Sequence, residues 1–278
     1  MGEATHDPAT ASSVTRGTDV VVRGLDKVYA AQTGEHVVAL KDVSLEVRSG
    51  EFVTLVGPSG CGKSTLLDIL AGLIEKTAGT VRIDGRDVTA GQPSRHVSLI
   101  FQKPVLLPWK TAVENVYMPA RVGEDPPAKR RGRELRNRAE ELLELVGLGA
   151  FAGKYSWELS GGMQQRVAIA RALLLEAAVM CMDEPFAALD EFTREQMHVE
   201  LLRIWDAQGF TAVFVTHNIF ESAFLSDRVL VMTPRPGRIV AEVDIDLPRP
   251  RNQDMLGSEA FADNVRRIRA AMTAHWNP

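Results

Sequence analysis

The sequence of 278 residues contains only two cysteines, Cys61 and Cys181, and no long uninterrupted apolar run. Two cysteines cannot build the disulfide framework that stabilises small secreted folds, and we interpret both as small packing residues of a protein in the reducing cytosol. No apolar run approaches the ~18 residues of a membrane span, and the polar N-terminus lacks an apolar signal segment. We therefore expect a chain that neither crosses a membrane nor is exported.

An excess of positive charge is also missing. The 32 Lys and Arg residues are outnumbered by 36 Asp and Glu residues, which gives a formal net charge of −4. These totals give no whole-chain argument for nucleic-acid binding, although a local basic patch would be compatible with them, and we expect no nucleic-acid partner. The length and the 45% hydrophobic content are sufficient for one large or two modest domains with a core.

A glycine-rich segment, GPSGCGKST, stands between a largely apolar run at 52–56 and a helix-like run at 66–70. Its residues are Gly57, Pro58, Ser59, Gly60, Cys61, Gly62, Lys63, Ser64 and Thr65. Glycines let the backbone turn tightly, so that amide N–H groups point at an anion held at the mouth of the following helix. Lys63 would then reach the β- and γ-phosphates of a nucleotide, and Ser64 would ligate Mg²⁺. The alternative, a strand-to-helix turn without a ligand, does not require Lys and Ser in this register.

Short segments of alternating polarity surround this motif. The alternation is clearest at 43–47 and predicts a half-exposed antiparallel sheet. Asp84-Gly85 is typical of a hairpin turn between two such strands. Residues 1–18 are rich in Ala, Ser, Thr and Gly without periodicity, which predicts a disordered leader.

Between about residues 103 and 175 the pattern changes from strands to helices, which predicts an inserted helical subdomain. Thr111 begins a capped helix, and residues 126–146 are helical, with basic residues followed by acidic ones. We interpret this charge run as a solvated helix face, with an anionic or protein contact as the alternative. Residues 251–278 predict a C-terminal extension with one amphipathic helix, whose apolar residues are Phe261, Val265, Ile268 and Met272.

A second glycine-containing motif, LSGGMQQR, covers residues 159–166 and opens an alanine-rich helix that runs to about Glu176. Ser160 is a natural N-cap, and Gly161 and Gly162 leave the first helix amides bare, so this helix start is also suited to an anion. A Ser-Gly-Gly cap alone is a common way to begin a helix. The whole motif, however, resembles the signature sequence of the ATP-binding cassette (ABC) family.

Two acidic residues and a histidine follow buried-strand patterns in the order of that family. Asp183-Glu184 resembles the Walker B carboxylates, and His217 resembles the switch histidine. The resemblance implies that Asp183 holds the Mg²⁺ shell with Ser64, that Glu184 accepts the proton of the attacking water, and that His217 contacts the γ-phosphate. Adjacent carboxylates at a strand end are also costly to bury without a cation. The alternative for His217 is a core histidine that caps a strand.

Three further positions extend the resemblance, which covers about residues 20–248. Gln102 falls at the Q-loop glutamine, which reaches the metal or the water, and Asp190 lies in a D-loop-like segment with Ala188 where Ser is more usual. Tyr29 falls at the aromatic that stacks on adenine, and an ordinary strand aromatic is an equally weighted alternative. The implied fold is an α/β P-loop NTPase core of the ABC ATPase type over residues 19–250, with a mixed sheet, an antiparallel β-subdomain and the inserted α-helical subdomain.

In the family's arrangement one chain cannot complete an active site. The motif of one copy approaches the γ-phosphate that Lys63 of a second copy binds, so two copies close head to tail over two ATP molecules. The residues that the resemblance assigns to this contact are Ser160, Gly161, Gly162, Gln164 and Asp190. It therefore implies ATP and Mg²⁺ as cofactors and a second copy of the chain as a partner.

Three short sequence segments, at 107–109, 234–239 and 246–251, resemble the corresponding segments of the importer ATPases of the nitrate, sulfonate and taurine group. This implies transmembrane permease subunits and, indirectly, a solute-binding protein as partners, with the chain peripheral on the cytoplasmic face of the inner membrane. An exporter subunit or a pyrimidine-precursor importer is the alternative. The apolar segment at 103–109 is expected to form one wall of a groove for a permease helix, unless Trp109 simply packs between the subdomains.

Other ATPase classes fit the sequence less well. A kinase would need an acceptor site and a lid, which we do not find, and it has no need of the second glycine motif. A chromosome-type cassette would carry a long coiled coil, for which the segment between Lys63 and Ser160 is too short. A translation-associated protein usually has two cassettes, whereas this chain has no internal repeat.

Overall fold

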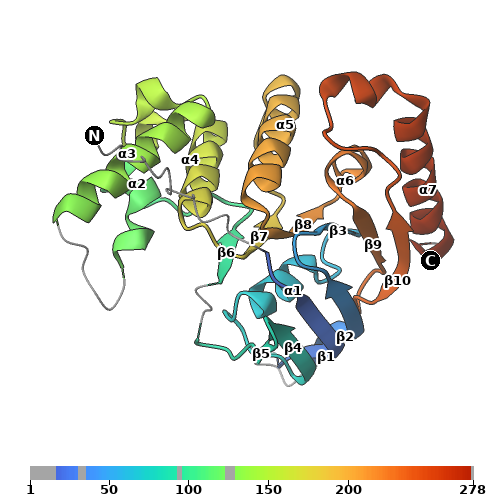
Figure 1. Cartoon of the computed structure of the whole chain (residues 1–278). Helices are drawn as coiled ribbons and strands as arrows, with labels where there is room; N and C mark the ends of the chain where they lie inside the picture. Colours follow the sequence, from blue (N-terminus) through green and yellow to red (C-terminus); the bar gives the residue numbers. More distant parts are fainter. Residues whose placement is uncertain (1–16, 31–35, 93–95, 123–128, 277–278) are drawn as a thin grey trace, which may run out of the picture.

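The computed structural model of the chain describes residues 17–30, 36–92, 96–122 and 129–276, and shows two sheets and a separate group of helices (Figure 1). The leader predicted for residues 1–18 lies almost entirely outside the described residues. The side chains of residues 129–131, which belong to the predicted basic run of the helix at 126–146, are also outside the described part. Gly17 donates its backbone N–H to the carbonyl of Gly209 at 2.7 Å, so the described chain begins in contact with the core.

The larger sheet has six strands in the order β10-β9-β3-β8-β7-β6. Their bounds are β3 (Phe52–Val56), β6 (Val97–Ile100), β7 (Val179–Asp183), β8 (Thr211–Thr216), β9 (Arg228–Met232) and β10 (Ile239–Asp244). Neighbouring strands are parallel except β10, which runs antiparallel to β9. Because the carboxyl ends of parallel strands meet at one edge, the segments that follow β3, β6, β7 and β8 gather there.

The parallel strands are buried on both faces, as their continuous apolar sequences predict. In β3, Val53 and Leu55 pack into the core on one side of the sheet, while Phe52 and Val56 pack into the core on the other side. The same alternation recurs in β7 and β8. Fully burying a side chain of this size stabilises the fold by roughly 1.5–3 kcal/mol, so these strands form a rigid base for the loops at their ends.

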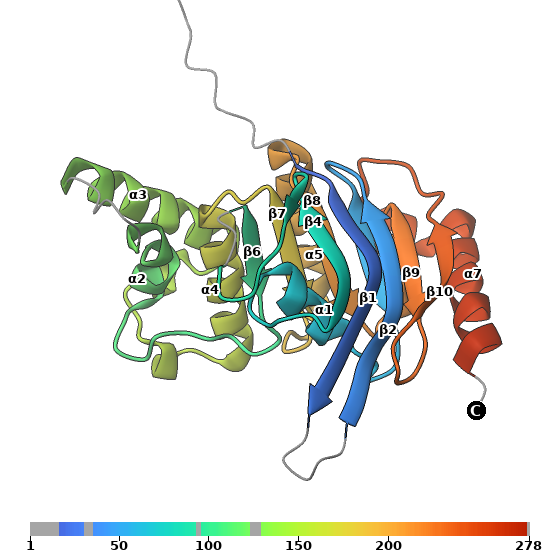
Figure 2. The ribbon, with the colours of Figure 1, turned by 90° about the horizontal axis from the view of Figure 1, so that it is seen from below.

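The smaller sheet is antiparallel, in the order β2-β1-β4-β5. Its strands are β1 (Val20–Ala30), β2 (His36–Val47), β4 (Ala78–Ile83) and β5 (Arg86–Asp87). Along β2, Val43, Leu45 and Val47 are buried while the residues between them are exposed, which confirms the predicted half-exposed strand. The predicted hairpin turn is also present, since Asp84 (φ 54°) and Gly85 (φ 68°) both take the positive φ of a tight hairpin. Helix α1 (Lys63–Leu70) packs its apolar residues into the core between the two sheets (Figure 2).

The helices inserted after β6 form a group at one end of the molecule (Figure 1). They are α2 (Ala112–Tyr117), η1 (Pro119–Arg121), α3 (Lys129–Leu145), η2 (Gly149–Phe151), η3 (Ser156–Glu158) and α4 (Gly161–Leu174). Thr111 caps α2 as predicted: its Oγ1 accepts from Glu114 N at 3.4 Å, and Glu114 Oε2 accepts from Thr111 N at 3.0 Å. Ser160 also caps its helix, α4, since its side chain accepts from Met163 N, but without a reciprocal bond.

The remaining helices cover the face of the large sheet opposite α1. They are α5 (Glu191–Gln208), α6 (Ile219–Leu225), η4 (Gln253–Gly257) and α7 (Glu259–Trp276). The four predicted apolar residues of α7 are all buried, which confirms the amphipathic helix. Within the described ranges, no helix is both long and apolar enough to span a membrane.

Candidate active site

A pocket of 480 Å³ opens where the carboxyl ends of the parallel strands meet the start of α1. Ten predicted site residues line it, namely Tyr29, Ser59, Gly60, Gly62, Lys63, Ser64, Thr65, Gln102, Asp183 and Glu184. They come from segments widely separated in sequence: β1, the glycine-rich loop, and the ends of β6 and β7. The fold therefore assembles one pocket from motifs that the sequence shows as separate.

The glycine-rich loop has the conformation of an anion cradle. Gly60 (φ 76°) and Gly62 (φ 107°) lie in the left-handed region, and a Cβ on Gly62 would stand 2.9 Å from the carbonyl oxygen of Ala39. Lys63 is only 6% exposed, and its Nζ donates to the carbonyls of Gly57 at 2.8 Å and Pro58 at 3.1 Å. These acceptors are neutral, so a bound phosphate would supply the opposite charge that favours a buried ammonium.

The acidic pair at the end of β7 lies beside this loop. Burial raises the pKa of Asp183, a hydrogen bond from Ser64 and the charge of Lys63 act to lower it, and the neighbouring Glu184 raises it further. A cation would favour the charged carboxylate. Among the described residues, no group of three or more His, Cys, Asp or Glu side chains is arranged to hold a metal ion. Mg²⁺ usually takes one or two protein oxygens and completes its shell with phosphates and water, so the Ser64 hydroxyl and Asp183 fit this ion.

Glu184 is held by side chains from two other strand ends. Its Oε2 accepts from Gln102 Nε2 at 3.3 Å, and its Oε1 lies 3.1 Å from His217 Nδ1. Its φ of 44° is unusual for a residue other than glycine, and its backbone N–H donates to the carbonyl of Val215 at 2.9 Å. The His217 side chain is 63% exposed, which contradicts the alternative of a core histidine. The carboxylate is thus fixed at the pocket wall, where it could take a proton from water.

Tyr29 stands at the edge of the same pocket. It is 41% exposed, and its hydroxyl lies 3.4 Å from Oγ1 of Thr65. Lys27 Nζ lies 4.7 Å from the centroid of its ring. Because the Tyr29 side chain lines the pocket beside the loop, its position favours a contact with a ligand over the role of an ordinary strand aromatic.

Nine predicted residues are not part of this lining. Four of them stand beside it: Gly57, Pro58 and Cys61 belong to the glycine-rich loop, and His217 contacts Glu184. The other five, Ser160, Gly161, Gly162, Gln164 and Asp190, lie at helix starts. Ser160 Oγ caps α4 by accepting from Met163 N at 3.3 Å, and Gln164 Nε2 donates to the carbonyl of Ser156 at 2.8 Å. Asp190 caps α5 by accepting from Thr193 N at 2.9 Å, and this bond lowers its pKa. Within one chain, Ser160 and Asp190 therefore cap helices, and none of the five residues lines the candidate nucleotide pocket.

Two residues at the site have no role in the sequence-based prediction. Arg235 lines the pocket, and its Nε and Nη2 donate to the carbonyl of Gly60 at 3.2 and 3.1 Å. Gln165 Nε2 donates to the carbonyl of Phe101 at 3.2 Å and so joins α4 to the segment that carries Gln102. No local sequence pattern could have predicted either contact, because each joins segments that are far apart in sequence.

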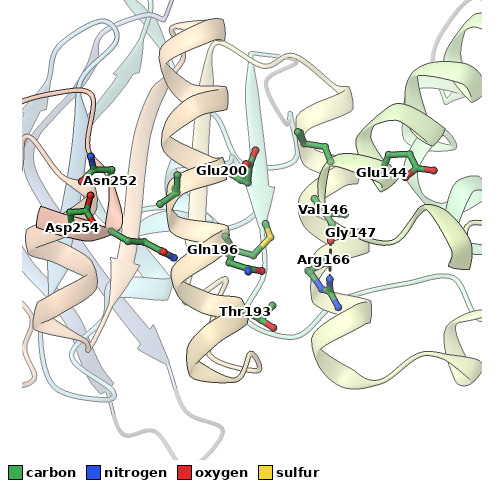
Figure 3. A pocket seen from close by; sticks show the side chains of 13 residues that line it. Glu144, Val146, Gly147, Arg166, Thr193, Gln196, Glu200, Asn252 and Asp254 are labelled. Atoms are coloured by element: carbon green, nitrogen blue, oxygen red, sulfur yellow. Dashed lines mark hydrogen bonds between the residues drawn. The ribbon is translucent and has the colours of Figure 1, made fainter. Parts of the chain in front are cut away.

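A larger cavity, of 610 Å³, lies between the end of α3, α4, α5 and the start of η4 (Figure 3). Arg166 projects from α4 at its edge and donates to the carbonyl of Val146 at 2.9 Å. Three acidic residues, Glu144, Glu200 and Asp254, also line it, and none of the predicted site residues does. This lining is less suited to a triphosphate, so the smaller pocket is the candidate nucleotide site.

Comparison with known proteins gives consistent matches. The family model described as ABC transporter matches residues 40–187. A taurine import ATP-binding protein of Rhizobium johnstonii is 48% identical over 221 residues, which are 80% of this chain and 82% of that protein. An aliphatic sulfonates import ATP-binding protein of Bacillus cereus is 40% identical over 249 residues, covering 90% of this chain and 94% of that protein. A nitrate import ATP-binding protein of Synechococcus elongatus is 44% identical over 247 residues, covering 88% of this chain but 37% of that longer protein.

Solved structures agree with these matches. A dimeric ATP-binding cassette in a post-hydrolysis state, bound to ADP and Pi, superposes with a TM-score of 0.74 at 34% identity. The match covers 82% of this chain and 100% of that one. The predicted α/β architecture of a mixed sheet, an antiparallel sheet and inserted helices is therefore confirmed.

Proposed function

Because the chain belongs to the ABC transporter family, we propose that it is the ATP-hydrolysing subunit of an importer for a small anion, such as taurine, another sulfonate or nitrate. The chain is an ABC ATPase that binds ATP. The observation that carries the catalytic assignment is the carboxylate of Glu184, held between Gln102 and His217 beside the cradle of Lys63. The names of the relatives, which cite taurine, sulfonate and nitrate import, support the direction of transport and the class of solute.

In the proposed mechanism the pocket first binds and orients ATP. Tyr29 stacks on adenine, and the amides of 57–65 surround the phosphates. Lys63 turns from the carbonyls of Gly57 and Pro58 toward the β- and γ-phosphates. Ser64, Asp183 and Gln102 would hold Mg²⁺, which would supply positive charge to offset that of the phosphates.

Glu184 then acts as the general base. It accepts a proton from the attacking water, while Gln102 and His217 fix the carboxylate and the water in line with the γ-phosphorus. The Glu184 carboxylate already contacts Gln102 and His217 before ATP binds, so this side chain needs little further ordering to act as a base. ADP and phosphate are the products.

We propose that a second copy of the chain completes the site. Ser160, Gly161, Gly162 and Gln164 lie away from the pocket of their own chain, and Ser160 and Gly161 are exposed at the start of α4. This helix start can meet the γ-phosphate held by the partner, with Asp190 between the two sites. The dimeric state of the similar solved cassette supports this arrangement.

The permease contact is proposed at the segment 103–109. Val105 is 57% exposed and Trp109 is 67% exposed, which contradicts the alternative that Trp109 packs between the subdomains. Thr111, which follows the segment, pairs with Tyr155, and Tyr155 stacks on the 64% exposed Trp157 with ring centroids 4.6 Å apart. A second segment with exposed aromatic side chains therefore runs beside the end of the first. Exposed apolar area of this kind is typical of a protein contact.

This contact would hold the chain peripherally on the cytoplasmic face of the membrane through its permease, with a solute-binding protein as an indirect partner. Within the chain, we propose residues 19–250 as the cassette, about 103–175 as its helical subdomain and 251–278 as the extension. Movement of the helical subdomain when ATP binds would change the surface offered to the permease, which is what coupling requires.

The proposal is tested in liposomes that contain the chain with its permease. Solute-binding protein loaded with taurine, an aliphatic sulfonate or nitrate is added outside, and ATP hydrolysis by the complex is measured. An importer predicts stimulation by the loaded binding protein for one of these solutes and none by the empty protein. Hydrolysis that responds to none of them, with solute leaving the cytoplasmic side instead, would support the exporter alternative.

A further inference from the structure

A buried charged cluster lies behind the loop that carries His217, and the mechanism above does not use it. Glu221 on α6 is 6% exposed and His198 on α5 is 7% exposed. Oε1 of Glu221 lies 3.3 Å from Nε2 of His198, and its Oε2 accepts from Oγ1 of Thr216 at 2.5 Å. A buried carboxylate adds little net stability even when it is paired, because desolvation is costly, but its contacts can fix the register of the elements that it joins.

On one side the cluster reaches the backbone around His217. Thr216, the residue before it, is 2% exposed and donates its hydroxyl hydrogen to Glu221. The same hydroxyl oxygen accepts from the backbone N–H of Asn218, the residue after His217, at 3.0 Å. The Glu221 carboxylate therefore fixes both ends of the turn from which His217 projects toward Glu184.

On the other side the cluster reaches the acidic strand end and the start of α5. His198 packs its ring edge to face with Phe186, two residues after Glu184, at a centroid distance of 5.0 Å. Arg194 Nε lies 3.9 Å from Oε1 of Glu221, and Arg194 Nη2 donates to the carbonyl of Leu189 at 2.8 Å, next to Asp190. One cluster thus contacts the segments that follow β7 and β8.

The protonation of the pair follows from its surroundings. Burial acts to raise the pKa of Glu221, but the hydrogen bond and charge of His198, together with Thr216 and Arg194, outweigh burial and lower that pKa. An ionised carboxylate only accepts hydrogen bonds, so Nε2 of His198 carries a hydrogen and donates it. The pair then holds α5 and α6 together at a defined distance.

We propose that Glu221 and His198 are positioning residues for hydrolysis, which hold His217 against Glu184 through the hydroxyl of Thr216. This inference rests on the proposed ATPase function. Neither side chain lines the nucleotide pocket. Loss of the pair should therefore slow turnover without weakening ATP binding, because the cradle at Lys63 is built from other segments.

The first test uses two substitutions of the buried Thr216 that keep its approximate shape. Thr216→Ser retains the hydroxyl, and Thr216→Val removes it while keeping a branched side chain. We expect Thr216→Val to lower kcat by about 10- to 100-fold, the effect of a small misplacement of catalytic groups, with Kd for ATP within about twofold of wild type. Thr216→Ser should retain most of the activity. Equal activity of the two variants, or a parallel loss of ATP affinity and kcat, would overturn the proposal.

A second pair of variants tests His198 should Thr216→Val fail to fold. His198→Gln keeps a donor near the position of Nε2, and His198→Leu removes it. We expect His198→Gln to restore most of the kcat that His198→Leu loses, at an unchanged Kd for ATP. If both variants have wild-type kcat, the positioning role is wrong. The two failures are distinguishable, because failure of the ATPase function on which this inference rests would appear as a wild-type protein that does not hydrolyse ATP.

Discussion

Nδ1 of His217 lies 3.1 Å from Oε1 of Glu184, although the whole of α5 and β8 separates the two residues in sequence. They meet because β7 and β8 are adjacent parallel strands, with Asp183 paired to Val215. Each strand therefore delivers its next residues to the same edge of the sheet. The contact brings together the proposed general base, which lines the pocket, and the histidine proposed to contact the γ-phosphate.

Tyr29 provides a test of the adenine site. Tyr29→Ala should weaken ATP binding by on the order of 1–3 kcal/mol, the value of one base–aromatic stack. Tyr29→Phe, which keeps the ring but loses the hydroxyl beside Thr65, should bind nearly as wild type. Calorimetric titration with ATP measures both. Unchanged affinity of the alanine variant would make Tyr29 a packing residue and place adenine elsewhere.

The composite site is tested by mixing two inactive variants. Lys63→Ala removes the phosphate contact, and Ser160→Arg blocks the start of α4, so each should abolish hydrolysis alone. Each proposed site takes Lys63 from one copy and Ser160 from the other. In a mixed dimer one site therefore contains both substituted residues and the other contains neither, so mixtures should recover part of the activity. Hydrolysis rates of the mixtures measure this. If mixtures stay inactive, either the two sites must act together or Ser160 serves its own chain, and site-specific crosslinking of Ser160 to nucleotide separates these cases.

Within the segment 103–109, the sequence alone predicts that polar substitution of Leu106 and Leu107 spares basal ATPase and abolishes assembly or uptake. In the structure both side chains are half-buried, and Leu106 packs against the core, so their polar substitution would also disturb folding. Exposed Val105 and Trp109 are cleaner targets. Val105→Ser with Trp109→Ser should leave basal ATPase within about twofold and abolish copurification with the permease, since only the exposed apolar area is lost.

The control for that surface is Leu175→Ser. Leu175 is 40% exposed just beyond the end of α4, in the turn that leads to β7 and away from the nucleotide edge of the sheet. We expect the Leu175→Ser protein to copurify with the permease as wild type does. Normal uptake by the Val105→Ser, Trp109→Ser protein would place the permease contact elsewhere, whereas loss of its basal ATPase would indicate a packing role.

Local features of this chain were predictable from sequence because short-range physics determines them. The Asp84-Gly85 turn, the Thr111 capping box and the buried face of α7 depend only on neighbouring residues. The glycine-rich loop could be predicted for the same reason, because its strand, turn and helix start follow one another directly in the sequence. Motif order and family resemblance then supplied the roles.

Contacts between distant segments could not be predicted in this way. Gln102 and Glu184 meet because β6 pairs with β7, and no pattern within either segment encodes that pairing. Arg235 reaches Gly60 because β9, which precedes it, pairs with β3, and the pair of His198 and Glu221 joins two helices. Such contacts depend on strand order and helix packing, which the local sequence constrains only weakly.

The most direct test of the account is the oligomeric mass of the Glu184→Gln protein in saturating Mg²⁺ and ATP, measured by light scattering. The amide cannot take the proton of the attacking water, yet it leaves the phosphate cradle intact, so ATP should remain bound between two copies. The account predicts a species of twice the 30.5 kDa chain mass, together with loss of hydrolysis. A protein that stays at the mass of one chain and hydrolyses ATP at the wild-type rate would contradict it.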